Sequence, residues 1–381
     1  MKKYLMMWIF CGLMVSCGKE KEYNYKPEPK PSTPAQGYEF ENIQEIFGFY
    51  GQQRYSYCPS IVKKDDGSIH VFFCGTQNMV MVDNIYHIRI NPDGNQTPAK
   101  IVLTPGTSES WDNHHTCDPS VIKGNFSMNE NNYQYAMFYL SNMYGVYYNE
   151  IGVAFSNDLE ANTWVKYPNQ VVKKTWSYDG DQGTGQDYKS WGVGQPSAVS
   201  LDRQGHVLLT YTIGDIDGTR IVWAEIDCSN MDNYTAGTAY TTMVNKGLSK
   251  IDYTGTDVTT DSDFAIDQIN NKIVIVRPVH PNPSIYPTHI EEAVEVAYMP
   301  LDDFLRSTGE WTPILRITPE ISGYPRNHNP GIERNAYGEI ENWEEPVIYY
   351  TVSLAAPDVE PSGTKFAEWT YHIWRGNVVK K

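Results

Sequence analysis

The segment Trp111–Ser120 combines an indole, two imidazoles and two carboxylates directly before a run of β-branched residues. Carboxylates and imidazoles are the side chains that most often move protons in catalysis. We predict Asp118 as a general base and His115 as a proton donor, because histidine titrates near neutral pH. His114 and Trp111 are expected to contact the ligand beside them. The alternative is structural, since an aspartate before proline often caps a turn through its own backbone.

A shorter form of this motif recurs along the chain. Its copies begin at Cys58-Pro59-Ser60, Asp118-Pro119-Ser120, Gln195-Pro196-Ser197, Asp263-Phe264-Ala265 and Asn329-Pro330-Gly331. The first residues of successive copies are 60, 77, 68 and 66 positions apart by subtraction of their numbers. Each copy opens a set of strands, so the repeat predicts an all-β chain folded as a five-bladed β-propeller. A two-sheet sandwich with chance Pro-Ser repeats is the alternative.

Short runs rich in Val, Ile, Tyr and Phe alternate with Asn/Asp/Gly turns from about Tyr38 onward, which is typical of strands. One helical turn is expected at Leu301–Leu305. A ring of blades must close where its first and last blades meet. Either Glu39–Phe49 or Tyr371–Val379 is predicted to supply the closing strand, so trimming the last dozen residues is expected to destabilise the fold strongly.

The innermost strand of each propeller blade starts near the central axis. The predicted ring at this end therefore consists of Cys58, Asp118, Gln195, Asp263 and Asn329. A concave ring of polar side chains suits a sugar.

These motifs resemble those of the five-bladed propeller glycosidases of glycoside hydrolase families 43 and 32, over roughly residues 40 to 380. The resemblance rests on Asp118-Pro119-Ser120-Val121-Ile122 and on Ile151–Asp158 followed by Trp164. It implies a base, a pKa-tuning aspartate and a glutamic acid at the first three blade starts. Asp118 matches the second position, whereas Cys58 and Gln195 stand where the other two acids are expected.

Glycoside hydrolysis needs a proton donor and a second carboxylate or base. Gln195 can supply neither, because an amide has no useful proton to give. We therefore predict Asp118 as the base, with His115, Asp263 or Glu333 as the donor. Gln195 and Asn329 remain candidate substrate-binding residues.

Other side chains near the predicted ring suggest how a ligand is held. Tyr57, Trp111 and Trp191 are expected to stack on sugar faces. Arg54 and Arg326 precede blade starts and could fork onto the carboxylate of an acidic sugar, although surface ion pairs are the alternative. No zinc-type spacing is present, and no cofactor is expected beyond an axial calcium, which the resemblance implies and for which His328 is the candidate ligand.

The first residues are typical of an exported lipoprotein. Residues 1–16 are predicted as a signal peptide, because Lys2 and Lys3 precede an apolar run too short to span a bilayer. The segment Met14–Cys17 resembles a bacterial lipobox, which implies lipidation of Cys17; a signal peptide cleaved without lipid is the alternative. Residues 17–37 form a Pro-rich tether, and residues 38–381 form the propeller. The expected location is the bacterial outer membrane, facing either the surface or the periplasm.

Composition restricts the partners. The formal net charge is −16 and no Lys/Arg cluster interrupts it, which excludes nucleic acid and leaves the lipid on Cys17 as the expected membrane contact. The expected partner is carbohydrate, and the expected state is a monomer. Free buried cysteines are the default expectation for Cys58, Cys74, Cys117 and Cys228, since their spacing selects no pairing. The candidate functions are a glycoside hydrolase, a non-catalytic glycan-binding propeller, and a lyase or atypical glycosidase that uses histidine.

Overall fold

The computed structural model describes residues 37–50, 54–77, 80–146, 148–175, 191–215, 217–237, 239–249, 259–279, 290–355 and 367–381. The predicted signal peptide, Cys17 and nearly all of the tether lie outside these residues. Within the described chain, no helix is both long enough and apolar enough to span a membrane.

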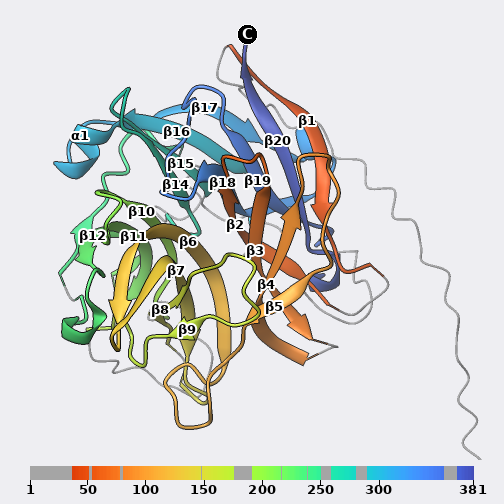
Figure 1. Cartoon of the computed structure of the whole chain (residues 1–381). Coiled ribbons are helices and arrows are strands. Elements are labelled where there is room, and N and C mark those ends of the chain that lie inside the picture. The colour runs from red at the N-terminus through yellow and green to blue at the C-terminus, as the bar shows by residue number, and fades with distance from the viewer. Residues whose placement is uncertain are drawn as a thin grey trace, which may run out of the picture.

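The described chain is almost entirely β (Figure 1). Three sheets have four strands each in the order of the sequence. The first contains β6 (His115–Met128), β7 (Asn131–Asn142), β8 (Glu150–Ser156) and β9 (Val165–Lys166). The second contains β10 (Gly192–Ser200), β11 (His206–Asp215), β12 (Gly218–Asp227) and β13 (Thr241–Thr242). The third contains β14 (Asp263–Asp267), β15 (Lys272–Pro278), β16 (Val294–Pro300) and β17 (Thr312–Ile317).

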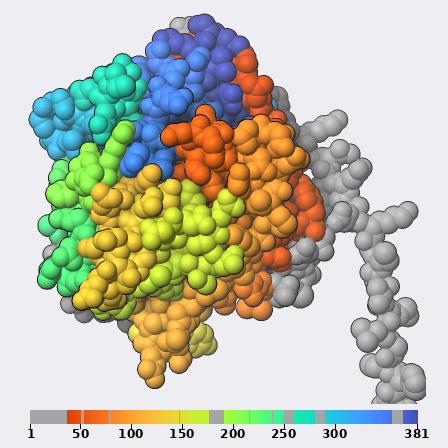
Figure 2. Space-filling view, viewed as in Figure 1, coloured from red at the N-terminus to blue at the C-terminus, as the bar shows by residue number. Residues whose placement is uncertain are grey.

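A larger sheet of eight strands joins the two ends of the chain. Its order is β1 (Tyr38–Phe47), β20 (His372–Lys380), β19 (Val347–Ser353), β18 (Arg326–Asn335), β2 (Ser56–Lys63), β3 (Ile69–Gln77), β4 (Val80–Ile90) and β5 (Lys100–Leu103). The N-terminal strand β1 pairs with the C-terminal strand β20, and Figure 2 shows the two ends together at the surface. Both predicted closing segments therefore take part in the same edge of this sheet.

The helical elements are short connections. They are α1 (Leu301–Leu305), α2 (Pro319–Ser322) and the 3-10 turns η2 (Met231–Asn233) and η3 (Glu368–Thr370). The helical turn expected at Leu301–Leu305 is confirmed as α1. The predicted closing segment Tyr371–Val379 lies almost wholly in β20, which starts at His372 directly after η3 and Tyr371.

The first strand of each four-strand group lies innermost. The strands β2, β6, β10 and β14 contact one another in sequence order, β14 contacts β18, and β18 pairs in parallel with β2. Apolar side chains from both faces of neighbouring sheets fill the spaces between them. Trp164 illustrates this packing, since it follows β8 and its ring meets Phe72 of β3 edge-on at 5.8 Å. The strands are thus buried on both faces, which explains their nearly continuous apolar sequences.

Two cysteines join neighbouring sheets. Cys74 of β3 and Cys117 of β6 form a disulfide, with their Cα atoms 5.1 Å apart. The default expectation of free cysteines is therefore wrong for this pair, whereas Cys58 and Cys228 are free. Sequence spacing could not select the pairing, because the two residues are 43 positions apart and meet only through the packing of two sheets.

Candidate functional site

Five residues with left-handed backbone geometry stand at the starts of the innermost strands. Their φ angles lie between 41° and 53°, a region that residues other than glycine rarely adopt. These residues are Cys58, Asp118, Gln195, Asp261 and Asn329. Four of them precede a proline, and at each of these four the pairing with the next strand skips two residues. Such bulges re-aim side chains out of a ladder and are found beside active sites.

The fourth residue with this geometry is Asp261, two positions before the predicted Asp263, although both residues line the same narrow passage. The fourth copy of the motif reads Asp261-Ser262-Asp263, without a proline, which moved the sequence alignment by two positions. Asp263 instead occupies the place that serine holds in the first three copies. In those copies the serine hydroxyl accepts a hydrogen bond from the next inner strand: Val121 N to Ser60 Oγ (3.2 Å), Ala198 N to Ser120 Oγ (2.9 Å) and Phe264 N to Ser197 Oγ (3.0 Å).

Asp263 continues this series of contacts between inner strands. Its Oδ2 accepts from Ile332 N at 2.9 Å, and its Oδ1 accepts from Ser197 Oγ at 2.6 Å. The buried guanidinium of Arg334 lies 3.3 Å from Asp263 Oδ1 and also donates to Ser120 Oγ at 3.1 Å. We call Asp263, Arg334, Ser120 and Ser197 the hub. Every hydrogen-bonding role of Asp263 there is structural, so it is not available to act as a proton donor.

The ring residues line a narrow passage of about 40 Å³ that lies next to a wider pocket of about 450 Å³. The wider volume falls within the range of small-molecule sites, roughly 300–1,000 Å³. Its acidic lining residues are Asp83, Asp118, Asp261, Glu291 and Glu368. No arginine or lysine is present among its described lining residues.

Three of these acids hold their protons more tightly than usual. Burial raises the pKa of Asp118 to about 6. The charge of Asp83 also raises this pKa, whereas hydrogen bonds from Cys58 and the Gln195 backbone lower it. Burial and then the charge of Asp118 raise the pKa of Asp261. Burial and then the charge of Asp261 raise the pKa of Glu291. Mutual repulsion of this kind leaves a proton in the group near neutral pH, as general acid catalysis requires.

The remaining ring residues orient these carboxyl groups. The Cys58 thiol hydrogen-bonds to Asp118. Gln195 Oε1 accepts from Asp261 N at 3.1 Å, and Asn329 Nδ2 donates to Asp261 Oδ1 at 2.9 Å. Gln195 and Asn329 thus hold Asp261 in place within the ring.

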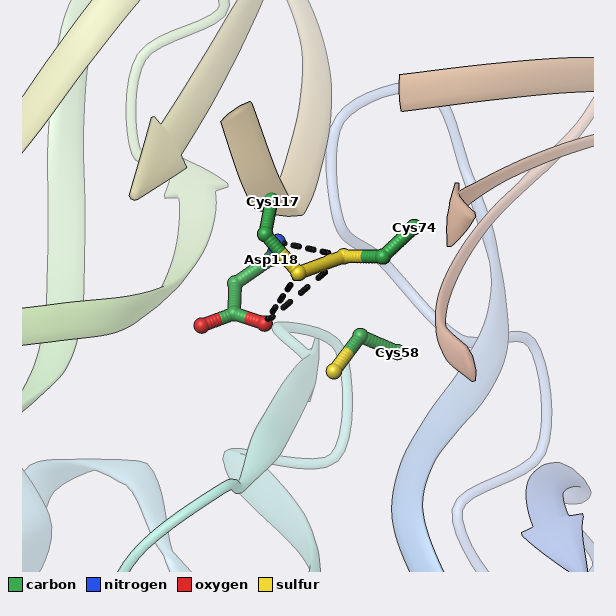
Figure 3. A group of neighbouring side chains, drawn as sticks. All are labelled: Cys58, Cys74, Cys117 and Asp118. Atoms are coloured by element: carbon green, nitrogen blue, oxygen red, sulfur yellow. Dashed lines mark hydrogen bonds between the residues drawn. A yellow bond between two sulfur atoms is a disulfide. The ribbon is translucent and has the colours of Figure 1, made fainter. Parts of the chain in front are cut away.

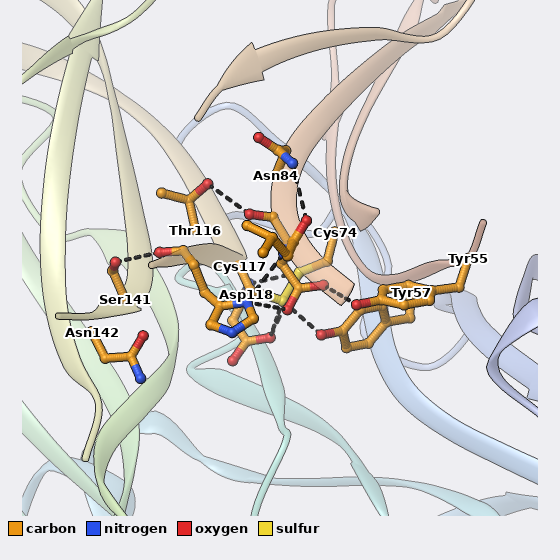
Figure 4. Close-up of polar contacts among 12 residues, drawn as sticks. Tyr55, Tyr57, Cys74, Asn84, Thr116, Cys117, Asp118, Ser141 and Asn142 are labelled. Atoms are coloured by element: carbon orange, nitrogen blue, oxygen red, sulfur yellow. Dashed lines mark hydrogen bonds and ion pairs between the residues drawn. A yellow bond between two sulfur atoms is a disulfide. The ribbon is translucent and has the colours of Figure 1, made fainter. Parts of the chain in front are cut away.

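His115 lies in the pocket wall beside Asp83. Figure 4 shows the residues that follow His115 in the chain, Thr116, Cys117 and Asp118. The His115 Nδ1 atom accepts from Asp83 N at 3.1 Å and lies 3.2 Å from Asp83 Oδ2. Asp83 also accepts from the Tyr55 hydroxyl at 2.7 Å. The structure therefore brings His115 into the same pocket as Asp118, as the sequence predicted, with Asp83 fixing the imidazole.

Aromatic residues form another part of the wall. Tyr55, Tyr57 and Tyr371 line the pocket, and their rings contact one another with centroids 5.4–6.2 Å apart. The Tyr57 hydroxyl lies 3.2 Å from Cys117 Sγ. Tyr57 is thus in a position to contact a ligand, and Tyr55 and Tyr371 join it although the sequence did not single them out.

Three aromatic residues predicted to bind substrate are placed elsewhere in the described structure. Trp111 stacks on Tyr139 at 6.0 Å, and Trp191 donates to Thr219 Oγ1 at 3.2 Å. The His114 ring packs on His115 with centroids 3.9 Å apart. None of Trp111, Trp191 and His114 lines the pocket, since packing within their own sheets holds the first two and His115 stands between His114 and Asp83.

The two predicted carboxylate-binding arginines are engaged outside the pocket lining. The Arg54 guanidinium lies over the Phe49 ring at 3.7 Å and donates to Thr76 O at 2.9 Å. Arg326 is buried, donates to Ala355 O at 3.0 Å and pairs with Glu292 at 3.2 Å. These contacts correct the expectation of an arginine fork at the ligand.

Glu333 lies at the other end of the innermost strands. It accepts from the Tyr349 hydroxyl at 3.1 Å and pairs with Lys63 at 3.4 Å and Arg375 at 3.6 Å. It lines a separate cavity of about 280 Å³. The three residues between Asn329 and Glu333 carry it along β18 away from the ring, so it is not placed to donate a proton beside Asp118.

His328 lies beside the ring, and the calcium site for which it is the candidate ligand stays a prediction. Its Nδ1 contacts Asn329 Oδ1, and its ring meets Tyr371 edge-on with centroids 4.8 Å apart. In the described part of the chain, His328 belongs to no group of acid, histidine and cysteine ligand atoms that gather around one point.

Comparisons with known proteins give the fold a context. No family model matches the sequence, and no curated protein matches it. Among solved structures, a family 117 glycoside hydrolase from the marine bacterium Zobellia galactanivorans has a TM-score of 0.54 at 9% identity, covering 90% of each chain. The catalytic domain of a GH62 alpha-L-arabinofuranosidase from Coprinopsis cinerea has a TM-score of 0.53 at 9% identity, covering 90% of this chain and 98% of that one. A GH62 hydrolase solved with xylotriose has a TM-score of 0.55 at 9% identity, with coverages of 90% and 97%.

The chain has the fold of the propeller-type glycoside hydrolases. This confirms the all-β propeller type, while membership of families 43 or 32 stays a prediction. At these identities the likeness concerns the fold alone, so the chemistry must be argued from the pocket.

The sequence missed several pocket residues. Asp261 had a usable signal, because aligning Asp261-Ser262-Asp263 with the X-Pro-Ser copies places it in the ring without any proline. Asp83, Glu291 and Glu368 had none, since they lie in or beside strand ends with no repeated motif and reach the pocket only through the packing of the sheets.

Proposed function

We propose that the protein is a glycoside hydrolase that acts on a polysaccharide or oligosaccharide at the pocket above the ring. The observation that carries this proposal is the group Asp118, Asp261 and Glu291, three buried acids in one pocket of about 450 Å³. A proton shared among them supplies a general acid near neutral pH, and an ionised member supplies the base.

The roles follow from the surroundings of each acid. Burial raises the pKa of all three acids, and the charge of Asp118 further raises the pKa of Asp261, as the charge of Asp261 does for Glu291, so Asp118 is proposed to ionise first. It is the proposed base, in agreement with its predicted role. Glu291 and Asp261 are the proposed proton donors, in place of Asp263 and Glu333. His115 is held by Asp83 in the same wall and is proposed to orient the substrate.

The proposal extends to the architecture and the location. The eight-stranded sheet divides at the parallel contact between β18 and β2, so we infer five blades of four strands, the last completed by β1. A lipid on Cys17 and the tether at 17–37 would then hold this propeller at the outer membrane, acting as a monomer on carbohydrate.

The substrate class follows from the charge of the pocket. Its described lining contains five acidic residues and neither lysine nor arginine, so a sugar carboxylate would be repelled. Neutral sugars are therefore proposed in place of the acidic sugar suggested by Arg54 and Arg326. The similarity to a GH62 alpha-L-arabinofuranosidase and to a GH62 hydrolase solved with xylotriose supports beginning with arabinose- and xylose-containing polysaccharides.

The test is release of reducing ends from a panel of neutral and uronic-acid polysaccharides. Asp118→Asn, Asp261→Asn and Glu291→Gln should each lower turnover by roughly 10²–10⁴-fold while the far-ultraviolet circular dichroism stays unchanged. Asp227→Asn is the matched control, because Asp227 is an exposed acid on β12 outside the pocket. Turnover that survives all three pocket substitutions would contradict the proposal.

The second candidate is a glycan-binding propeller without turnover. It is favoured by Cys58 and Gln195, which stand where the resembling families have two acids and which are used to orient Asp118 and Asp261. Binding of a polysaccharide without release of reducing ends, unchanged in Glu291→Gln, is the result that would select it.

A further inference from the structure

Three sulfur atoms and one carboxylate gather at the floor of the pocket. Figure 3 shows Cys58, Cys74, Cys117 and Asp118 directed toward one another. One ligand atom from each of the four lies within 4.8 Å of all the others. Among the residues that the structure describes, these are the ones whose acid, histidine and cysteine ligand atoms meet in this way.

The backbone fixes this arrangement from three strands of two adjacent four-strand groups. Cys58 and Asp118 occupy equivalent bulges of β2 and β6, where φ values of 51° and 46° turn their side chains inward. Cys74 lies on β3 opposite Tyr57, the neighbour of Cys58. The cluster is thus built into the ladder rather than assembled from surface loops.

In its oxidised form the cluster has one free thiol beside a disulfide. The Asp118 backbone N–H donates to Cys74 Sγ at 2.9 Å, and Asp118 Oδ1 lies 3.2 Å from Cys117 Sγ. The Cys58 thiol hydrogen-bonds to the same carboxyl group. The proposed catalytic base therefore touches all three sulfur atoms.

We propose that this cluster is a reduction-dependent site for one thiophilic divalent cation of the zinc class. A dithiol reductant first opens the Cys74–Cys117 disulfide: its two thiols give up two electrons and two protons and form its own disulfide, and each cysteine becomes a thiol. The cation then displaces the thiol protons of Cys58, Cys74 and Cys117, and binds the three thiolates and one oxygen of Asp118.

The geometry and charge fit such a cation. Zinc takes four ligands in a tetrahedron, with bonds of about 2.3 Å to sulfur and about 2.0–2.2 Å to carboxylate oxygen, which places ligand atoms about 3.5–3.8 Å apart. Opening the disulfide frees the sulfur atoms of Cys74 and Cys117 to separate to this spacing, and all four ligand atoms already lie within 4.8 Å of one another. Asp83 adds negative charge close by, and the described pocket lining contains neither lysine nor arginine.

Metal binding would occupy Asp118 and so would remove the proposed base from catalysis. This consequence rests on the proposed function, but the site itself does not. The test below measures the metal and not turnover, so either proposal can fail without the other.

The experiment is a titration of the full chain with Co²⁺, as a spectroscopic substitute for Zn²⁺, under anaerobic conditions. The protein is compared before and after treatment with a dithiol reductant that is then removed. We expect the reduced wild type to bind one equivalent with thiolate-to-cobalt charge-transfer absorption, and the oxidised protein to lack that absorption. Cys58→Ser should weaken binding at least about 100-fold, and Asp118→Asn should weaken it less.

Cys228→Ser is the matched control, because Cys228 is a buried free thiol outside the cluster. It should bind as the wild type does, and Cys11 and Cys17 are common to all the proteins compared. Equal binding by reduced wild type and Cys58→Ser would overturn the proposal. If reduction abolishes the cooperative thermal transition, Zn²⁺ should restore that transition in wild type but not in Cys58→Ser; no restoration would equally overturn it.

Discussion

Asp261 and Asp263 are two residues apart, yet their surroundings differ completely. Asp263 belongs to the hub, where Arg334 lies 3.3 Å away and Ser197 and the Ile332 backbone donate to it. Asp261 belongs to the ring, where its neighbours include the acids Asp118 and Glu291 and its hydrogen bonds come from neutral groups. A paired carboxylate stabilises the fold, whereas buried acids that repel one another store free energy that catalysis can use.

The largest expected effect comes from breaking the hub. Arg334→Met leaves Asp263 as a buried carboxylate without its cation, and such a loss costs about 3–5 kcal/mol. The free energy of unfolding in urea measures it. The double variant Arg334→Met/Asp263→Asn should recover part of the loss, because the unpaired charge is then gone. A cost below about 1 kcal/mol in the single variant would show that the hub is not structural.

The disulfide offers the next comparison, because it joins two neighbouring sheets beside the ring. Replacing Cys74 and Cys117 together by serine should lower the free energy of unfolding by about 2–4 kcal/mol, since the bridge closes a loop of 43 residues. Cys228→Ser serves as the control for loss of a buried thiol. An unfolding midpoint equal to that of the control would contradict the assigned bridge.

The parallel contact between β18 and β2 can be tested at Gly331. A Cβ on Gly331 would lie 2.3 Å from Pro59 O, so Gly331→Ala must push two inner strands apart. We expect a loss of about 1–3 kcal/mol, measured by urea unfolding. Gly237→Ala is the matched control, because a Cβ there meets nothing closer than 3.7 Å. Equal stability of the two variants would argue against a tight contact between these strands.

The last expected effect is a gain in stability, and it comes from a ring residue. The folded pKa of Asp118 is raised to about 6 from 3.8, so the folded chain keeps a proton that the unfolded chain releases first. The resulting stability is fully present below pH 3.8 and is lost as the pH rises through about 6. Asp118→Asn cannot lose it, and should become more stable than wild type by about 1–3 kcal/mol above pH 6.

Urea unfolding of wild type and Asp118→Asn from pH 4 to pH 8 measures this difference. Asp227→Asn provides a control, since its exposed carboxyl has a lowered pKa and should not show the same gain. A variant that is less stable than wild type at every pH would mean that Asp118 is a structural cap, the alternative that its position before Pro119 left open.

The sequence predicted the parts of this molecule that repeat. Four Pro-containing starts, the strands that follow them and the meeting of Cys58, Asp118, Gln195 and Asn329 could all be inferred from local patterns. The fourth ring residue was misplaced, because the motif there lacks the proline that marks the bulge. Asp83 and Glu291 could not be predicted, since they lie in or beside strands without a motif and reach the pocket only after the sheets have packed.

The same limit explains the misassigned candidates. Glu333 and Arg326 lie on β18 close in sequence to Asn329, but strand geometry carries Glu333 away from the ring and Arg326 turns to Glu292 and Ala355. Trp111 and Trp191 are near the ring along the chain and pack instead on Tyr139 and Thr219. Proximity in sequence determines the position of a residue along a strand, whereas residues on other strands determine which contacts its side chain makes.

One paired measurement tests the central claim that the ring carries the chemistry and the hub carries the fold. Asp261→Asn and Asp263→Asn make the same change two residues apart, and turnover per folded molecule and the free energy of unfolding are measured for both at pH 7. We expect Asp261→Asn to lose at least about 100-fold in turnover without losing stability, and Asp263→Asn to lose stability while its folded fraction keeps turnover. Full turnover in Asp261→Asn, or unchanged stability in Asp263→Asn, would contradict the account.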